Sequence, residues 1–352
     1  MRRWEANQLT EQRDSAVPAP APALRGGRAG ELWSNPAFTA ALALALVFIL
    51  GLIFSGEGAF YKWGTHRDAL RQASVFGILA CGMTVVIITA GIDLSVGSLL
   101  ALAAVAFSIF SIHWGWSPWV AIPLCILVGG ACGLVSGSLV ALCRIQPFIV
   151  TLAMMVFARG LAKWVSGGMK VSTAVPAADG TYTYVGVPAI FRTIDSRWFG
   201  GNLSVVTVIF LLCVLVSWVG LARLRWGRYL YAIGGNEEAS RLSGVPVAAM
   251  KMVAYTLAGL SAAVAGICQA AQEQQGDPEA GSGYELSAIA IVVIGGTNLM
   301  GGRGGIGLTL LGTLIIGYIE KILSINAVGE ASRLMLTGAI IVIAVLIQRR
   351  RS

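Results

Sequence analysis

Long apolar stretches recur along this 352-residue chain and constrain its fold more than any other feature. Windows such as residues 37–54, 75–92 and 204–221 come close to the roughly 20 apolar residues with which a helix crosses a bilayer. Only 12% of the residues are charged and 56% are hydrophobic, whereas soluble globular proteins carry about 25% charged residues. The sequence therefore predicts an all-α polytopic membrane protein.

About ten transmembrane helices are expected in a transmembrane domain of residues 37–348. They are placed near residues 37–54, 73–92, 95–112, 119–142, 147–165, 203–221, 252–271, 286–299, 306–323 and 334–347. The predicted inner segments hold more than twice as many Lys and Arg as the outer ones, as the positive-inside rule requires. Both termini are therefore expected in the cytoplasm, and the short eighth span is the one expected to be broken or tilted.

The segments outside these spans are few. Residues 1–36 are expected to form a disordered cytoplasmic tail. On the outer side, residues 65–72 suit a short polar helix and residues 181–188 a strand. Residues 272–285 are acidic, which suits either a basic partner or plain solvation.

Composition excludes several classes of function. The net charge of +8 is explained by loop Lys and Arg that set orientation, and no basic stripe interleaved with aromatics indicates nucleic acid. The six cysteines contain no CxxC pair and the two histidines are far apart, so neither a disulfide framework nor a metal site is predicted. We expect the chain to bind no cofactor.

The sequence contains no motif for ATP hydrolysis or other catalysis. It has no Gly-Lys dipeptide and so no phosphate-binding P-loop, and it shows no nucleophile elbow or paired carboxylates. A transporter rather than an enzyme is predicted, driven by a gradient or by another subunit. Spans that hold few ionisable groups argue against a proton-coupled carrier. Asp93 suits a helix N-cap, with a proton site as the alternative, and Arg159 with Lys163 suits snorkelling or a substrate contact.

Residues 223–251 form the longest polar interruption in the second half of the chain. Gly234 and Gly235 are expected to act as a flexible hinge. A short helix capped by Asn236 follows, with acidic residues in its first turn and an arginine in its last. The helix breaks at Gly244, so a self-capped helix between two spans is predicted.

Glycine is dense at residues 294–307, which hold seven of them. Such a run permits broken backbone near the membrane edge, which is tolerated only inside protein or against a water path. Glycines at residues 129–137 have the spacing of close helix packing. Residues 295–299 echo residues 90–94, with Asn298 where Asp93 stands, which is consistent with a duplication.

Four ordered motifs carry a family resemblance: GMTVVIITAGIDLSVGSLLAL (82–102), QPFIVTLAMM with ARGLA (146–162), YAIGGNEEASRLSGV (231–245) and GYELSAIAIVVIGGTNLMGGRG (283–304). From about residue 37 to residue 347, the chain resembles the membrane permeases of bacterial ribose/xylose-type ABC sugar importers. Glu238-Ala239-Ser240 followed by Gly244 resembles the EAA signature, whose loop binds the ATPase subunit.

The resemblance implies a permease of the inner (plasma) membrane that imports a monosaccharide of the ribose, xylose or galactose kind. Its partners would be a cytoplasmic ATP-binding-cassette ATPase that holds ATP and Mg, a periplasmic sugar-binding protein and a second permease copy, as homodimer or heterodimer. The implied ATPase-coupling residues are Gly234, Gly235, Asn236, Glu237, Glu238, Ala239, Arg241, Leu242 and Gly244. We expect the translocation path to follow the glycine-bearing spans two, three, eight and nine, with Asp93, Ser95, Gly97, Gly295, Gly296 and Asn298 on it.

The sequence departs from this family pattern at Ser287, where the family usually has Asp, and at the last span, which ends in Gln348 and arginines. Other cargoes stay open, namely branched-chain amino acids, nucleosides or a signalling furanoside. A stand-alone secondary carrier or channel and a transport-inactive interaction protein are the alternatives from other classes.

Overall fold

The computed structural model describes residues 35–176 and 181–349, so most of the predicted tail lies outside the described residues. Its long helices are α3 (Pro36–Ile53), α4 (Trp63–Ile88), α5 (Val96–Ser108), α6 (Pro118–Ala141), α7 (Pro147–Ser166), α9 (Val205–Arg223), α12 (Val247–Glu273), α14 (Ile306–Ile325) and α15 (Glu330–Arg349). Shorter ones are η1 (Ala59–Tyr61), the π-turn η2 (Ile109–His113), α8 (Ala189–Ile194), α10 (Arg225–Gly235), α11 (Glu237–Leu242) and α13 (Tyr284–Gly295).

The predicted all-α membrane architecture is confirmed. Within the described residues, eight helices, counting α5 with η2 as one, are long and apolar enough to cross a membrane, and α13 and α15 occupy the other two predicted spans. The prediction of a separate polar helix at residues 65–72 is wrong, because these residues form the first turns of α4. Helix α13 has only 12 residues and ends where Gly296 adopts φ 111°, so the eighth span is shorter than predicted.

Helix α12 lies at the centre of the bundle, packed against α4, α5 and α6. Its contact with α6 is made backbone to backbone. A Cβ atom on Gly129 would lie 2.5 Å from the Gly259 oxygen, and one on Gly133 would lie 2.3 Å from the Tyr255 oxygen. The predicted close-packing role of these glycines is confirmed, since only small residues let membrane helices approach so closely.

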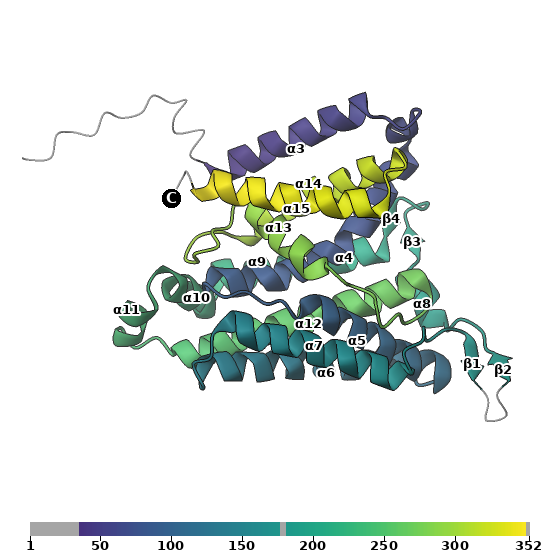
Figure 1. Cartoon of the computed structure of the whole chain (residues 1–352), viewed down its shortest axis with the longest axis horizontal. Coiled ribbons are helices and arrows are strands. Elements are labelled where there is room, and N and C mark those ends of the chain that lie inside the picture. The colour runs from purple at the N-terminus through teal and green to yellow at the C-terminus, as the bar shows by residue number, and fades with distance from the viewer. Residues whose placement is uncertain (1–34, 177–180, 350–352) are drawn as a thin grey trace, which may run out of the picture. The chain divides into compact units, whose positions relative to one another are not determined.

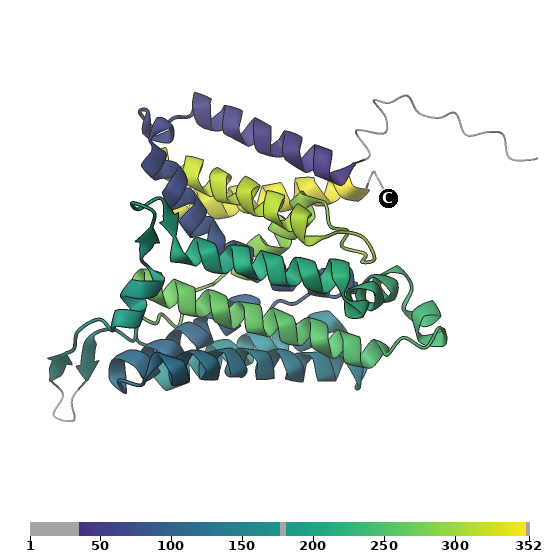
Figure 2. The same cartoon turned by 180° about the vertical axis from the view of Figure 1, so that it is seen from behind.

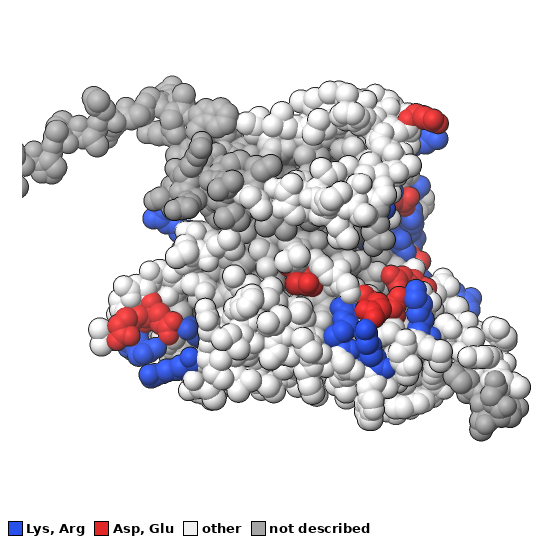
Figure 3. All heavy atoms as spheres, viewed as in Figure 1, with Lys and Arg blue, Asp and Glu red and all other residues white. Residues whose placement is uncertain are grey.

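The bundle has two distinct ends (Figure 1, Figure 2). We call the end that carries α10 and α11 the inner end, and the end that carries α8 and the four short strands the outer end. Figure 3 shows Lys, Arg, Asp and Glu gathered at these ends, with a nearly uncharged band between them. Exposed apolar side chains such as Leu127, Phe157 and Leu212 lie in the middle turns of α6, α7 and α9, as a bilayer requires.

Two small hairpins lie at the outer end. Strand β1 (Ala174–Pro176) pairs antiparallel with β2 (Tyr182–Tyr184), and β3 (Arg197–Trp198) pairs with β4 (Leu203–Ser204). The predicted strand at residues 181–188 is therefore confirmed only in its first half.

Candidate functional site

Helix α11 is a short helix at the inner end with its own cap. The Asn236 side chain accepts a hydrogen bond of 2.9 Å from the Ala239 backbone N–H, as an N-cap does. The helix stops at Leu242, and Gly244 turns the chain with φ 81°. The predicted self-capped helix is confirmed.

One ion pair ties α11 to α12, and another stabilises α11 internally. Glu237 accepts hydrogen bonds from Arg241 at 2.9 Å and from Lys251 on α12 at 2.6 Å. The Lys251 side chain is only 17% exposed, so this contact is screened less than a fully exposed pair. Glu237 therefore ties α11 to the first turns of the central helix.

The opposite face of α11 is open. Leu242 is 81% exposed, the Glu238 side chain is 71% exposed, and Ala239 and Arg241 are exposed beside them. Helix α11 therefore presents Leu242 and a charged side chain to the outside, where a partner protein can reach them.

Helix α10 connects this tip to the membrane helices. Leu230 and Ile233 are buried on its inner face. The predicted flexible hinge is wrong, because Gly234 and Gly235 are the last residues of this helix. Sequence reasoning missed α10, although Leu230 and Ile233 have the i, i+3 spacing of a helix face.

Gly234 lies in a three-way junction of backbones. A Cβ atom there would lie 1.9 Å from the Ile88 oxygen at the end of α4 and 2.4 Å from the Gly302 nitrogen. Gly302 in turn donates a 3.0 Å hydrogen bond to the Ile88 oxygen, and Tyr231 donates one of 3.0 Å to the Gly304 oxygen. The predicted coupling loop therefore contacts both α4 and the glycine-rich loop before α14.

The segment after α4 is held by Asp93. Its Oδ1 accepts from the Ser95 N–H at 2.9 Å and from the Ser95 hydroxyl at 2.6 Å, and both residues are fully buried. Helix α5 begins at Val96 with Ser95 at its N-cap position, so Asp93 binds the residue at that position and the prediction that Asp93 itself is the N-cap is wrong. Asn298 makes the equivalent bond to the Met300 N–H at 3.0 Å, which agrees with the echo between the two segments.

Asp93 also has an unsatisfied oxygen. Within the described residues, neither its Oδ2 nor the buried Tyr255 hydroxyl of α12 has a hydrogen-bond partner. The Tyr255 hydroxyl faces Gly91, where a Cβ atom would lie 2.6 Å from its oxygen. Leaving such groups unpaired costs about 1–3 kcal/mol each, so a partner such as ordered water is expected there.

The start of α5 meets the start of α13. A Cβ atom on Gly97 would lie 2.3 Å from the Gly281 oxygen and 2.4 Å from a Glu285 side-chain oxygen. Arg159 on α7 holds the same loop by donating to the Pro278 and Ala280 oxygens at 2.5 and 2.8 Å. Arg159 therefore holds the loop in place by binding its carbonyl groups. The sequence suggested either snorkelling or a substrate contact, and neither interpretation foresaw this role.

The acidic outer segment is paired within the chain. Glu279 lies 2.5 Å from Lys163, and Asp277 lies 2.9 Å from Lys170. The hydrogen bond with Asp277 raises the pKa of Lys170, and although burial acts in the opposite sense, Lys170 lowers the pKa of Asp277. These carboxylates are already neutralised by lysines, so they offer less charge to a basic partner than the sequence suggests.

The six residues predicted for the translocation path lie in two groups. Asp93, Ser95 and Gly97 are buried where α5 begins, and Gly295, Gly296 and Asn298 lie where α13 ends. Gly302, in the loop that follows the second group, contacts the coupling loop at Gly234 and Gly235. Their place on the path stays a prediction.

A family model described as the permease component of the branched-chain amino acid transport system matches residues 67–345. The chain belongs to this permease family. The permease is 39% identical to the ribose import permease protein of Escherichia coli, over 88% of this chain and 92% of the relative. It is 41% identical to the ribose import permease protein of Bacillus subtilis, over 87% and 91%.

A third relative is named for a different sugar. The fructose import permease protein of Rhizobium meliloti is 35% identical, over 90% of the permease and 86% of the relative. No solved structure shows a significant match to the permease. The family resemblance drawn from the four motifs is confirmed.

Proposed function

We propose that this chain is the transmembrane subunit of an ATP-driven ABC importer that moves a monosaccharide across the bacterial inner membrane. Relatives named for ribose and fructose import support a sugar as cargo. The observation that carries the ATP-driven part is α11, which is capped and tethered yet presents Leu242 and Glu238 to the outside. That geometry suits a helix seated in a cleft of an ATPase subunit, which binds the ATP and Mg.

The importer would contain this permease, a second permease copy, two ATPase domains and a periplasmic sugar-binding protein. Each partner shifts the permease between outward-open and inward-open states only by its difference in affinity for the two. The excess of Lys and Arg in the inner segments supports cytoplasmic termini. A C-terminal reporter active only in the periplasm is expected to stay silent, and a signal from it would reverse the orientation.

The coupling role is tested by Leu242→Glu. The substitution places a charge on a side chain that is 81% exposed, so the fold is expected to stay intact while ATPase binding falls. Met169→Glu makes the same change on a 56% exposed side chain at the outer end and serves as the control. Equal recovery of the ATPase with both purified variants would contradict the assignment of α11.

The cargo and the energy source are separable by one uptake experiment. Proteoliposomes that hold the complete transporter are supplied with labelled ribose, fructose or leucine, with and without ATP at the ATPase side. We expect ATP-dependent uptake of a sugar. ATP-dependent leucine uptake would favour the amino-acid cargo that the family description names, and uptake without ATP would favour a secondary carrier.

A further inference from the structure

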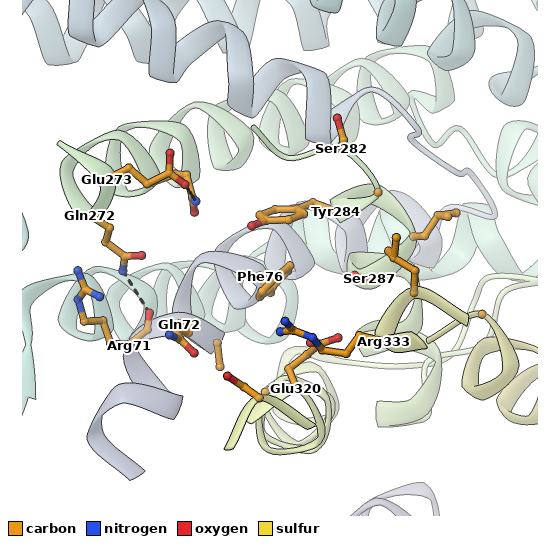
Figure 4. A pocket seen from close by; sticks show the side chains of 18 residues that line it. Arg71, Gln72, Phe76, Gln272, Glu273, Ser282, Tyr284, Ser287, Glu320 and Arg333 are labelled. Carbon is orange, nitrogen blue, oxygen red and sulfur yellow. Dashed lines mark hydrogen bonds between the residues drawn. The ribbon is translucent and has the colours of Figure 1, made fainter. Parts of the chain in front are cut away.

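A large cavity lies near the outer end, apart from the residues predicted for the path. It has a volume of about 570 Å³ and is formed by the starts of α4, α13 and α15 with the ends of α12 and α14. This volume falls within the roughly 300–1,000 Å³ typical of small-molecule sites. Segments of five helices, far apart in the sequence, therefore line one space (Figure 4).

The rim of this cavity is polar but balanced in charge. Its charged side chains are Arg71, Glu273, Glu320 and Arg333, two of each sign. Arg71 forms an ion pair with Asp195, and Arg333 and Glu320 both line the cavity (Figure 4). Charges of both signs with at most one unit in excess, once Asp195 is counted, do not strongly select an ion, so the lining suits a neutral ligand.

Planar amides supply paired donors and acceptors around the same space. Gln72, Gln269 and Gln272 all line it, and Gln272 is positioned by a 3.3 Å hydrogen bond to the Arg71 oxygen. A side-chain amide offers two donor hydrogens and one acceptor oxygen. Adjacent hydroxyl groups on a ligand match this pattern, because each hydroxyl both donates and accepts.

The floor of the cavity is aromatic and closed. The rings of Phe76 and Tyr284 lie 4.4 Å apart between centroids, tilted by 44°. Beside them, a Cβ atom on Gly317 would lie 2.4 Å from the Ala73 Cβ, so α4 and α14 leave no gap. Aromatic side chains at the floor of a polar cavity provide an apolar surface for the C–H face of a ring-shaped ligand.

We propose that this cavity is a binding site for a neutral, polyhydroxylated ring, a monosaccharide, within the permease itself. The site receives the sugar at the outer end and holds it above Phe76 and Tyr284 until the helices separate. Ser287 lines it as a neutral residue and so adds no further charge. The inference rests on the proposed function, since it names where the cargo of that function is first bound.

The test is saturation-transfer NMR on the full-length permease in nanodiscs, without ATPase or binding protein. Ribose, fructose and leucine are the probes, each at up to tens of millimolar. We expect transfer to a sugar and none to leucine. Gln72→Ala and Gln272→Ala are expected to weaken sugar binding about tenfold each, since each removes a lining amide whose hydrogen bond to a hydroxyl is worth about that factor.

The control is Gln146→Ala, which removes an exposed amide at the inner end and is expected to leave sugar binding unchanged. Absence of sugar binding, or equal binding by all three variants, would overturn the inference. If the complete transporter still imports a sugar with ATP in that case, the proposed function stands and only the site falls. If leucine is bound and imported while no sugar is bound or imported, both the proposed function and the proposed site are wrong.

Discussion

Gly234→Ala is the sharpest test of how α11 communicates with the membrane helices. The added methyl group would lie 1.9 Å from the Ile88 oxygen and 2.4 Å from the Gly302 nitrogen. Both are backbone atoms, so no side chain can rotate away to make room. The backbone of α10 must move by about 1 Å, or the hydrogen bond from Gly302 to Ile88 must open.

The neighbouring glycine provides a matched control. Within the described residues, a Cβ atom on Gly235 has nothing within 4 Å, and both glycines end the same helix. Gly235→Ala is expected to be neutral or stabilising by a few tenths of a kcal/mol to about 1 kcal/mol. Overpacking at Gly234 is expected to cost about 1–3 kcal/mol.

The assay compares both variants in the complete transporter. Gly234→Ala is expected to retain the ATPase, because the exposed face of α11 is unchanged, but to lower ATP-driven sugar uptake by about tenfold or more relative to Gly235→Ala. Melting temperatures confirm that both variants fold. Equal uptake by the two variants would refute the idea that the contacts of Gly234 with Ile88 and Gly302 couple the ATPase to transport.

Three further substitutions test local parts of the structure. Asn236→Ala removes the cap of α11 and is expected to cost about 1 kcal/mol, seen as roughly fivefold faster amide exchange in that helix; unchanged exchange would contradict the cap. Gly97→Ala is expected to lower the melting temperature by several degrees, because its methyl group meets backbone, whereas Gly160→Ala, with nothing within 4 Å among the described residues, is not. Asp93→Asn keeps an acceptor for Ser95, so uptake and its pH profile are expected to persist; loss of pH dependence would instead indicate a proton site.

Sequence reasoning succeeded where the determining interactions are local. The spans follow from apolar length alone, and the α11 cap follows from Asn236 and the N–H group three residues later. The hinge prediction failed because a glycine that allows bending and a glycine that allows close contact look the same in sequence. The partners of Gly234, Ile88 and Gly302, are brought to it only by the tertiary fold.

The same limit applies to charged residues. Nothing in the spacing of Arg159 and Lys163 predicts that the first binds loop carbonyls and the second binds Glu279. The outer cavity is also invisible in sequence, since its lining comes from five helices, each contributing a few residues. Its polar residues look like ordinary helix ends until the fold brings them together.

Helix α4 joins the two regions. It runs without a break from Trp63 to Ile88, so the cavity floor at Phe76 and the junction at Ile88 lie about 18 Å apart on one rigid element. A displacement of α11 that reaches Ile88 must therefore move Phe76 as well.

By linkage, ATPase binding must then change sugar affinity by the same factor as the sugar changes ATPase affinity. We expect the sugar affinity of the permease, measured by NMR with and without ATP-bound ATPase, to differ by about fivefold or more. In Gly234→Ala this difference is expected to vanish while sugar binding itself persists. An unchanged difference in that variant would show that the signal bypasses the junction.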